Sequence, residues 1–157
     1  MSTIDDTKIE ATIDDLKNML GEQMGRSDVL ELTQDRVTAF GGVTLDFDPH
    51  HIDPTQAEKG PFGGAAAQGF LTLSLLTYFI STSRMKVDIK QHINYGLNKV
   101  RFIKPAMVGE HLQAVFTLQG VDERKPGAPI LSFRVEVLSK EQDAPVMVAE
   151  WLAMVIV

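Results

Sequence analysis

The sequence contains no cysteine, so the chain can form no disulfide and has no thiolate to bind a metal or act as a nucleophile. Positive charge is also scarce: 15 Lys and Arg face 21 Asp and Glu, which gives a formal net charge of −6. This balance argues against nucleic-acid binding, which usually needs a basic surface. A local basic patch for a phosphorylated ligand stays compatible with it.

Long hydrophobic runs are missing as well. The longest apolar stretch, residues 70–80, is interrupted by hydroxyl groups and is too short to span a bilayer. The first 15 residues are acidic and polar, unlike a secretory signal. We therefore expect a cytoplasmic protein that does not bind to or insert into a membrane.

The length and hydrophobic content of the chain suit one globular domain. A chain of 157 residues with 44% hydrophobic content can bury about two-thirds of its unfolded surface without disulfides or metals. We expect a polar N-terminal tail over residues 1–11 and a single domain over residues 12–157.

The first half of the chain predicts short elements. Apolar spacing predicts a helix over residues 13–20, ended by Gly21. Residues 23–33 predict a strand. Thr33 then suits the N-cap of a short helix that Gly41 and its neighbouring glycine would close.

The second half predicts one buried helix and a sheet. Residues 65–80 carry almost no charge, and a helix that is apolar nearly all round must be surrounded. Alternating apolar residues predict antiparallel strands over residues 93–103, 111–121 and 130–138, and a hydrophobic run predicts a fourth over residues 146–157. The fold class is therefore α+β, with a curved antiparallel sheet wrapped around a long central helix.

An acid–base cluster precedes the predicted helix. Residues 46–53 hold three carboxylates and two histidines, in a loop bent by Pro49 and Pro54. Asp46 and His51 could face one point, hold a water and move its two protons separately, because histidine titrates near neutral pH. The alternative is a solvated turn, followed by one helical turn that Thr55 would cap.

Other site chemistries are less well supported. The cluster has metal-ligand side chains, but no second group of His, Asp or Glu follows to complete a shell, so we expect no metal. A catalytic serine triad is also less well supported, because the sequence lacks the Gly-x-Ser-x-Gly motif.

Gly63, Gly64 and Gly69 leave backbone amides uncovered near a helix start, where they could bind an oxyanion or simply form a tight junction. These groups favour chemistry at a carbonyl or its conjugated double bond.

The cluster also resembles a family motif. Residues 46–54, Asp-Phe-Asp-Pro-His-His-Ile-Asp-Pro, are similar to the Asp-x-Asn-Pro-x-His-x-Asp motif of the MaoC-like, (R)-specific enoyl-CoA hydratases. Residues 61–63 and 68–71 continue that pattern. Residues 94–102, Asn-Tyr-Gly-Leu-Asn-Lys-Val-Arg-Phe, resemble the subgroup related to nodulation protein N. The resemblance covers nearly the whole chain from about residue 12.

The resemblance implies a hot-dog fold, a homodimer, an acyl-CoA or acyl carrier protein thioester as substrate, and no metal or organic cofactor. By the motif, Asp46 and His51 would hold the water that adds across a trans-2-enoyl thioester to give the (R)-3-hydroxyacyl product. The Gly69 amide would polarise the thioester carbonyl, and Thr77 stands where relatives often carry a serine. A hot-dog thioesterase, or a protein that binds acyl thioesters without catalysis, is the alternative function.

Two positions depart from the family pattern. Gln68 stands where the family usually has histidine, so it can orient groups but cannot transfer a proton. Asp48 replaces the usual asparagine, and a second carboxylate beside Asp46 tends to raise the pKa of one of the two.

Arg101 and Lys104, at the end of the first long strand, are candidates to bind the phosphates of coenzyme A. The alternative is that they are solvated residues at a strand end.

Overall fold

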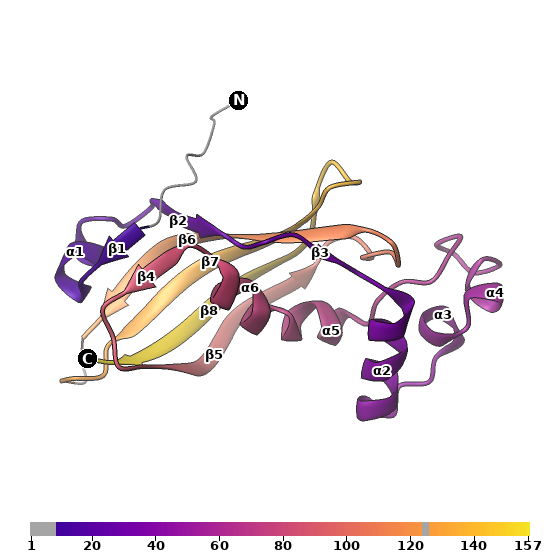
Figure 1. Ribbon diagram of the computed structural model, residues 1–157, viewed down its shortest axis with the longest axis horizontal. Helices are drawn as coiled ribbons and strands as arrows, with labels where there is room; N and C mark the ends of the chain where they lie inside the picture. The colour runs from indigo at the N-terminus through magenta and orange to yellow at the C-terminus, as the bar shows by residue number, and fades with distance from the viewer. Residues whose placement is uncertain (1–8, 124–125) are drawn as a thin grey trace.

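The computed structural model describes residues 9–123 and 126–157 and contains a curved, six-stranded antiparallel sheet (Figure 1). The strand order is β2-β6-β7-β8-β5, and β3 also pairs with β6. The six strands are β2 (Gln23–Arg26), β3 (Leu30–Glu31), β5 (Gln91–Phe102), β6 (His111–Asp122), β7 (Ile130–Ser139) and β8 (Pro145–Ile156). A separate parallel pair joins β1 (Ile9–Ala11) to β4 (Met85–Val87).

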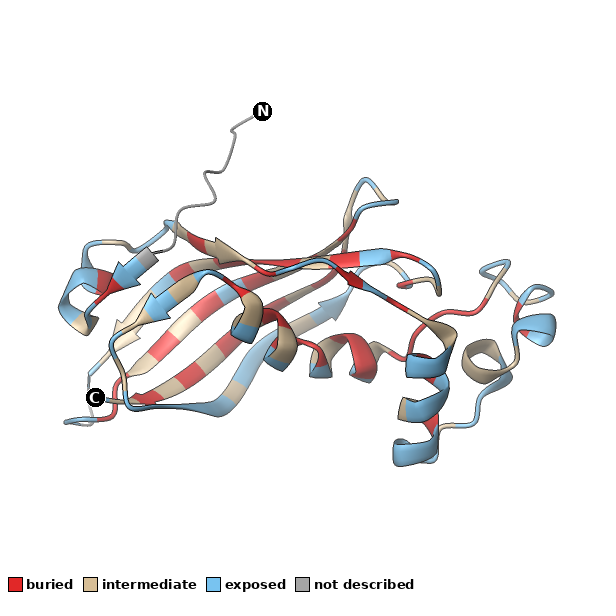
Figure 2. Ribbon diagram, in the orientation of Figure 1, coloured by how far each residue is buried: buried red, intermediate tan, exposed pale blue. Residues whose placement is uncertain are grey.

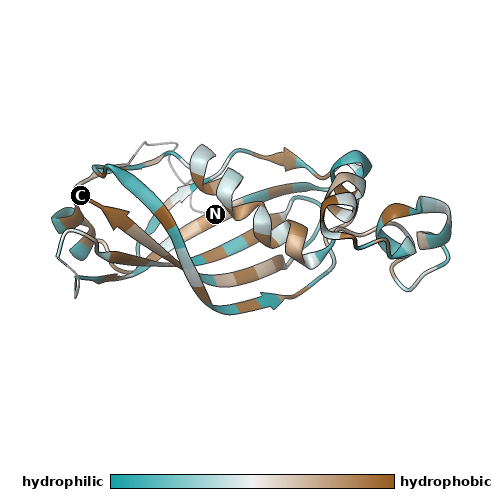
Figure 3. Ribbon diagram, turned by 90° about the horizontal axis from the view of Figure 1, so that it is seen from below, coloured by the Kyte–Doolittle hydropathy of each residue, from teal (hydrophilic) through white to brown (hydrophobic). Residues whose placement is uncertain are grey.

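The helices are short and fall into three groups. They are α1 (Ile13–Lys17), α2 (Gln34–Thr44), α3 (Pro49–Ile52), α4 (Pro54–Ala57), α5 (Gly69–Ser74) and α6 (Leu76–Thr82). The sheet curves around α5 and α6, whereas α2, α3 and α4 extend beyond one end of it (Figures 1 and 3). The expected α+β arrangement, a curved antiparallel sheet around a central helical segment, is confirmed.

The core lies between the concave face of the sheet and the two central helices. Along β7, Leu131, Phe133, Val135 and Val137 are buried while their neighbours are more exposed, as the alternation of colours along the strands shows (Figure 2). From the helices, Leu71, Leu76 and Phe79 belong to the same core. The alternation predicted over residues 111–121 and 130–138 is confirmed, because its apolar residues, such as Leu112, Phe116 and Phe133, are buried.

The prediction of one long helix over residues 65–80 is wrong in two respects. It begins at Gly69, because residues 65–67 are extended: Ala67 N–H donates to Ala106 O at 2.8 Å, and Ala66 pairs with Met107. It is also interrupted at Leu75, which ends α5 and precedes α6.

Helix α2 does not close at Gly41. It continues to Thr44 and ends where Leu45 adopts a left-handed conformation with φ 61°, so that its N–H reaches Gly41 O. Thr33 caps the start of α2, as predicted: its hydroxyl accepts from Arg36 N–H at 3.3 Å.

Three smaller predictions need correction. The strand expected over residues 23–33 is split into β2 and β3 at Ser27, where Ala114 N–H donates to the Ser27 hydroxyl at 2.9 Å instead of to its backbone oxygen. The cluster is not a loop, since Pro49 starts α3. Asp53, not Thr55, caps α4: its carboxylate accepts from Gln56 N–H at 3.1 Å.

Residues 9–11, which we expected to belong to the N-terminal tail, form β1 beside β4. Residues 1–8, the remainder of the expected tail, and residues 124–125, between β6 and β7, lie outside the described residues. Across residues 9–123 and 126–157, no helix has both the length and the apolar character needed to cross a membrane.

Candidate active site

The end of α2 sets the position of Asp46. The left-handed turn at Leu45 redirects the chain, and Asp46 N–H then donates to Gly41 O at 3.0 Å. The Asp46 side chain remains 43% exposed. Its backbone is therefore anchored while its carboxylate stays accessible.

His51 lies on α3, and its ring is oriented by a backbone oxygen. Nδ1 is 2.7 Å from Ala66 O, which belongs to the extended segment before α5. Because a carbonyl oxygen can only accept, Nδ1 carries the hydrogen and Nε2 presents a lone pair when the ring is neutral. The neutral imidazole thus directs its basic nitrogen, Nε2, toward Asp46.

Nε2 of His51 faces the carboxylate of Asp46 across 3.9 Å. This separation is too long for a direct hydrogen bond but lets a single water contact both groups. The structure therefore brings together the two residues that the motif predicts as the catalytic pair, Asp46 from the connection after α2 and His51 from α3.

Asp48 acts as a cap beside this pair. Its carboxylate accepts from the N–H of His50 at 2.9 Å and from the His50 ring at 2.8 Å. These two hydrogen bonds, the backbone one first, hold the pKa of Asp48 below its usual range. Asp48 is therefore not a carboxyl with a raised pKa. Asn and Asp cap helices about equally well, so the replacement of the family's asparagine preserves the local structure.

A cavity of about 350 Å³ opens beside His51. Its lining includes Gly69 at the start of α5, the buried Thr72, and Phe102 at the end of β5. A Cβ added at Gly69 would lie 3.1 Å from the Phe102 ring, so glycine is what allows this ring to pack over the start of the helix. Gly69, expected to contact the substrate carbonyl, thus shares a cavity with His51.

Gln68 lies behind this cavity. It is 2% exposed, and its Nε2 donates to Val37 O at 3.2 Å. Its Oε1 is buried and has no partner among the described residues. The side chain that replaces the family's histidine therefore faces α2, not the Asp46–His51 pair.

The remaining candidates are dispersed. Lys104 lines the cavity with His51 and pairs with Asp143 at 2.7 Å. Arg101 precedes Phe102 on β5, so it projects from the opposite face of the sheet. Gly63 has φ 71° in a turn, with nothing within 4 Å of an added Cβ.

Thr77 borders a different cavity, of about 530 Å³, between α6 and the sheet. Its hydroxyl donates to Ser74 O at 3.0 Å. The cavity wall combines aliphatic and aromatic side chains with Ser81, His92 and Asn94. Burial lowers the pKa of His92, so that imidazole is neutral at pH 7.

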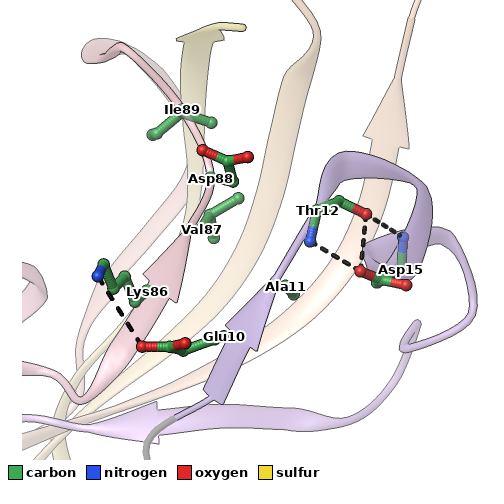
Figure 4. Close-up of a pocket in the computed structure, with 8 residues that line it drawn as sticks. All are labelled: Glu10, Ala11, Thr12, Asp15, Lys86, Val87, Asp88 and Ile89. Carbon is green, nitrogen blue, oxygen red and sulfur yellow. Dashed lines mark hydrogen bonds and ion pairs between the residues drawn. The ribbon is translucent and has the colours of Figure 1, made fainter.

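A third cleft, between β1 and β4, lies at the other end of the molecule from α3 and α4 (Figures 1 and 4). There Asp15 accepts from the backbone and hydroxyl of Thr12, and Lys86 pairs with Glu10 at 3.9 Å. These groups satisfy one another at the surface. Within the described part of the chain, no three His, Asp or Glu side chains are grouped as metal ligands would be.

Four residues of the site were not identified from the sequence. They are Ala66, whose carbonyl orients His51; Gln34, whose Nε2 donates to His51 O at 2.8 Å; Gly41, which anchors Asp46; and Phe102. Three of them act through backbone atoms or close packing, which leave no distinctive side-chain pattern. The double glycine at residues 41–42 was the only signal, and we interpreted it as a helix end.

The sequence and the structure both match known proteins. The family model described as MaoC like domain matches residues 15–137. The 3-hydroxyacyl-thioester dehydratase Z of Mycobacterium tuberculosis H37Rv is 37% identical over 139 residues, which cover 88% of this chain and 92% of the relative. Nodulation protein N of Rhizobium meliloti is 32% identical over 146 residues, covering 92% and 91%.

Among solved structures, the MaoC-like dehydratase from Rhodospirillum rubrum superimposes with a TM-score of 0.74 at 22% identity. The match covers 90% of this chain and 95% of that one. The curved sheet around α5 and α6 is accordingly the hot-dog fold. The family match, which spans most of the chain and includes Asp46, His51 and Gly69, shows that the protein belongs to the MaoC-like domain family.

Proposed function

We propose that the protein is an (R)-specific enoyl-CoA hydratase, or 3-hydroxyacyl-CoA dehydratase in the reverse direction. Family membership and the dehydratase named among its relatives support a hydratase or dehydratase activity. The observation that carries the finer proposal is the pairing of Asp46 Oδ2 with His51 Nε2 across 3.9 Å, beside Gly69.

In this mechanism a water lies between Asp46 and His51. His51 Nε2 accepts one proton as the water oxygen bonds to C3 of the enoyl thioester, because Nδ1 is already committed to Ala66 O. The electron pair of the C2–C3 double bond moves toward the thioester carbonyl, whose oxygen the Gly69 N–H stabilises. Return of one proton from the pair to C2 completes the addition of water.

The cavity beside α6 suits an acyl chain. It begins at Thr77, two helical turns beyond Gly69, and its volume of about 530 Å³ is typical of small-molecule sites. No Lys or Arg lines it among the described residues. The absence of these cations supports an uncharged acyl tail in the cavity beside α6. Lys104 lines the other cavity, with His51, and could contact the polar end of the substrate there.

The free edge of β5 supports a homodimer. This strand has 12 residues and pairs only with β8 in the described sheet, so it ends the sheet with unpaired backbone groups. Ile93, Tyr95 and Leu97 on it are exposed apolar or aromatic residues. A long exposed edge that carries apolar and aromatic side chains favours pairing with a second chain.

The decisive experiment follows the enoyl absorbance of crotonyl-CoA during hydration. Asp46→Asn and His51→Ala should each lower kcat by about 10²- to 10⁴-fold, because each removes a group that handles the water. Asp53→Asn, which keeps the cap of α4, is the matched control and should retain activity. Unchanged kcat in both site variants would exclude the proposed pair.

The same assay separates the alternative functions. Release of free CoA thiol while the enoyl absorbance persists would indicate thioester hydrolysis. Binding of acyl-CoA without turnover at any chain length would indicate a non-catalytic binder. The chirality of the 3-hydroxyacyl product, determined with an (R)-specific coupling dehydrogenase, tests the stereochemical part of the proposal.

A further inference from the structure

One side of α2 contacts three separate parts of the candidate site. Gln34, Val37 and Gly41 are spaced i, i+3 and i+7, which places them on the same side of a helix. Each of them hydrogen-bonds a segment that follows α2 in the chain. The three segments carry Asp46, His51 and Gly69.

The first contact fixes α3. Gln34 Nε2 donates to His51 O at 2.8 Å. None of the four residues of α3 is fully buried, so this short helix has little hydrophobic packing of its own beyond the half-buried Ile52. The hydrogen bond from α2 therefore constrains the backbone of the residue that carries the imidazole.

The second contact fixes the start of α5. Gln68 Nε2 donates to Val37 O at 3.2 Å, and both residues are buried. Gln68 directly precedes Gly69, so its side chain ties the Gly69 backbone to α2.

The third contact fixes Asp46. Gly41 O accepts from Asp46 N–H at 3.0 Å. A Cβ added at Gly41 would lie 2.7 Å from Asp46 O, 3.2 Å from the Ile52 side chain and 3.3 Å from Gln68 Nε2. Only glycine lets α2 approach all three segments at this point.

We propose that α2 is the positioning element of the active site, and that Gln34, Gly41 and Gln68 are positioning residues that act through it. They set the distance between Asp46 and His51 and the place of both relative to Gly69. The kinetic part of this inference rests on the proposed hydratase function. A shift of about 1 Å in such groups lowers turnover by about 100-fold.

The first test compares two adjacent glycines in the same helix. Gly41→Ala places a methyl group against Asp46 O, whereas a Cβ at Gly42 meets nothing within 4 Å. With crotonyl-CoA, Gly41→Ala should lower kcat about 10- to 100-fold with KM within about twofold of the parent. Gly42→Ala should keep both constants, because it changes helix propensity equally but touches no site segment.

The second test removes the hydrogen bond to His51. Gln34→Leu keeps the side-chain volume and should lower kcat by about 10-fold or more, again with little change in KM. Gln113→Leu is the control: Gln113 Nε2 likewise donates to a backbone carbonyl, Ser27 O at 2.7 Å, but on β6. If circular dichroism shows that Gly41→Ala is not folded, the kinetic test of the positioning role depends on Gln34→Leu alone.

A third measurement does not require turnover. ¹⁵N NMR of histidine-labelled protein reports which ring nitrogen of His51 carries the hydrogen, and His51→Ala identifies its signals. Gln34→Leu and Gly41→Ala should shift these signals away from the Nδ1–H form, and the two controls should not.

The outcomes separate the two proposals. In an active parent, kcat within twofold of the parent in both site-facing variants overturns the positioning role, and the proposed function stands. In an inactive parent the proposed function fails, and the ring signals alone decide: a change in both variants supports positioning by α2, and unchanged signals overturn it.

Discussion

At the residue scale, the surroundings of Glu141 strongly affect the protonation of its carboxylate. It accepts from His111 N–H at 2.9 Å and from the His111 ring at 2.8 Å. These bonds, the backbone one first, lower the pKa of Glu141 to about 2. A depressed pKa in the folded state stabilises the fold above the unfolded-state value of 4.5, and this stabilisation is lost as the pH falls toward about 2.

Glu141→Gln should therefore weaken the acid dependence of stability. We expect the urea midpoint of the parent to fall between pH 5 and pH 2.5, and that of Glu141→Gln to fall less over the same window. Urea titrations at several pH values measure this difference. Glu58→Gln, at the exposed end of α4, is the control and should follow the parent. Equal pH dependence in parent and Glu141→Gln would contradict this role of the carboxylate.

The sequence predicts the identity of the candidate site's side chains better than their partners. The spacing of Asp46 and His51 names the pair, and both face one point in the structure. The carbonyl of Ala66 and the amide of Gln34 are 15 and 17 residues from His51 in the chain. Such long-range partners depend on tertiary packing, which a local motif does not encode.

At the scale of elements, the two central helices join the sheet to the active site. Phe79 of α6 is fully buried in the core, whereas Phe70 of α5 is 70% exposed. Phe79→Ala should lower the free energy of unfolding by about 3–5 kcal/mol, because it leaves a cavity against the sheet. Phe70→Ala should cost about 1 kcal/mol or less, since it loses only partial packing with Phe102.

Chemical denaturation of the two variants provides the measurement. Similar losses for Phe79→Ala and Phe70→Ala would show that the central segment does not anchor the sheet as described. The m-value should stay near that of the parent, because neither substitution alters the surface exposed on unfolding by much.

Elements with strong periodicity were predicted well, and those decided by single backbone conformations were not. The strands over residues 111–121, 130–138 and 146–157 lie within about one residue of β6, β7 and β8. Helix α2 continues beyond Gly41 and its neighbouring glycine, because the residue with the left-handed conformation that ends it is Leu45, not Gly41. The start of α5 moved to Gly69 because residues 65–67 pair with the loop before β6, a tertiary contact.

At the scale of the whole molecule, the proposed dimer gives the exposed edge of β5 a partner. Tyr95, near its centre, is 54% exposed. Tyr95→Lys should convert a dimer into monomers, because a charge on an edge strand opposes pairing. Sedimentation velocity at micromolar concentration tests this. Val43→Lys on α2 changes an apolar residue that is even more exposed, at 84%, and should leave the dimer intact. A monomeric parent would refute the dimer.

The position of residues 41–66, which carry the proposed Asp46–His51 pair, beyond the end of the sheet also bears on how this protein can evolve (Figure 1). Among the described residues, none from 41 to 66 belongs to the main hydrophobic core, which resumes at Ala67. Substitutions at the exposed positions of that segment therefore cost little folding free energy, whereas the buried Ala57 and Ala66 are constrained. New side chains beside Asp46 and His51 can be sampled while the sheet stays folded, so selection can change the reaction without first having to restore a damaged scaffold.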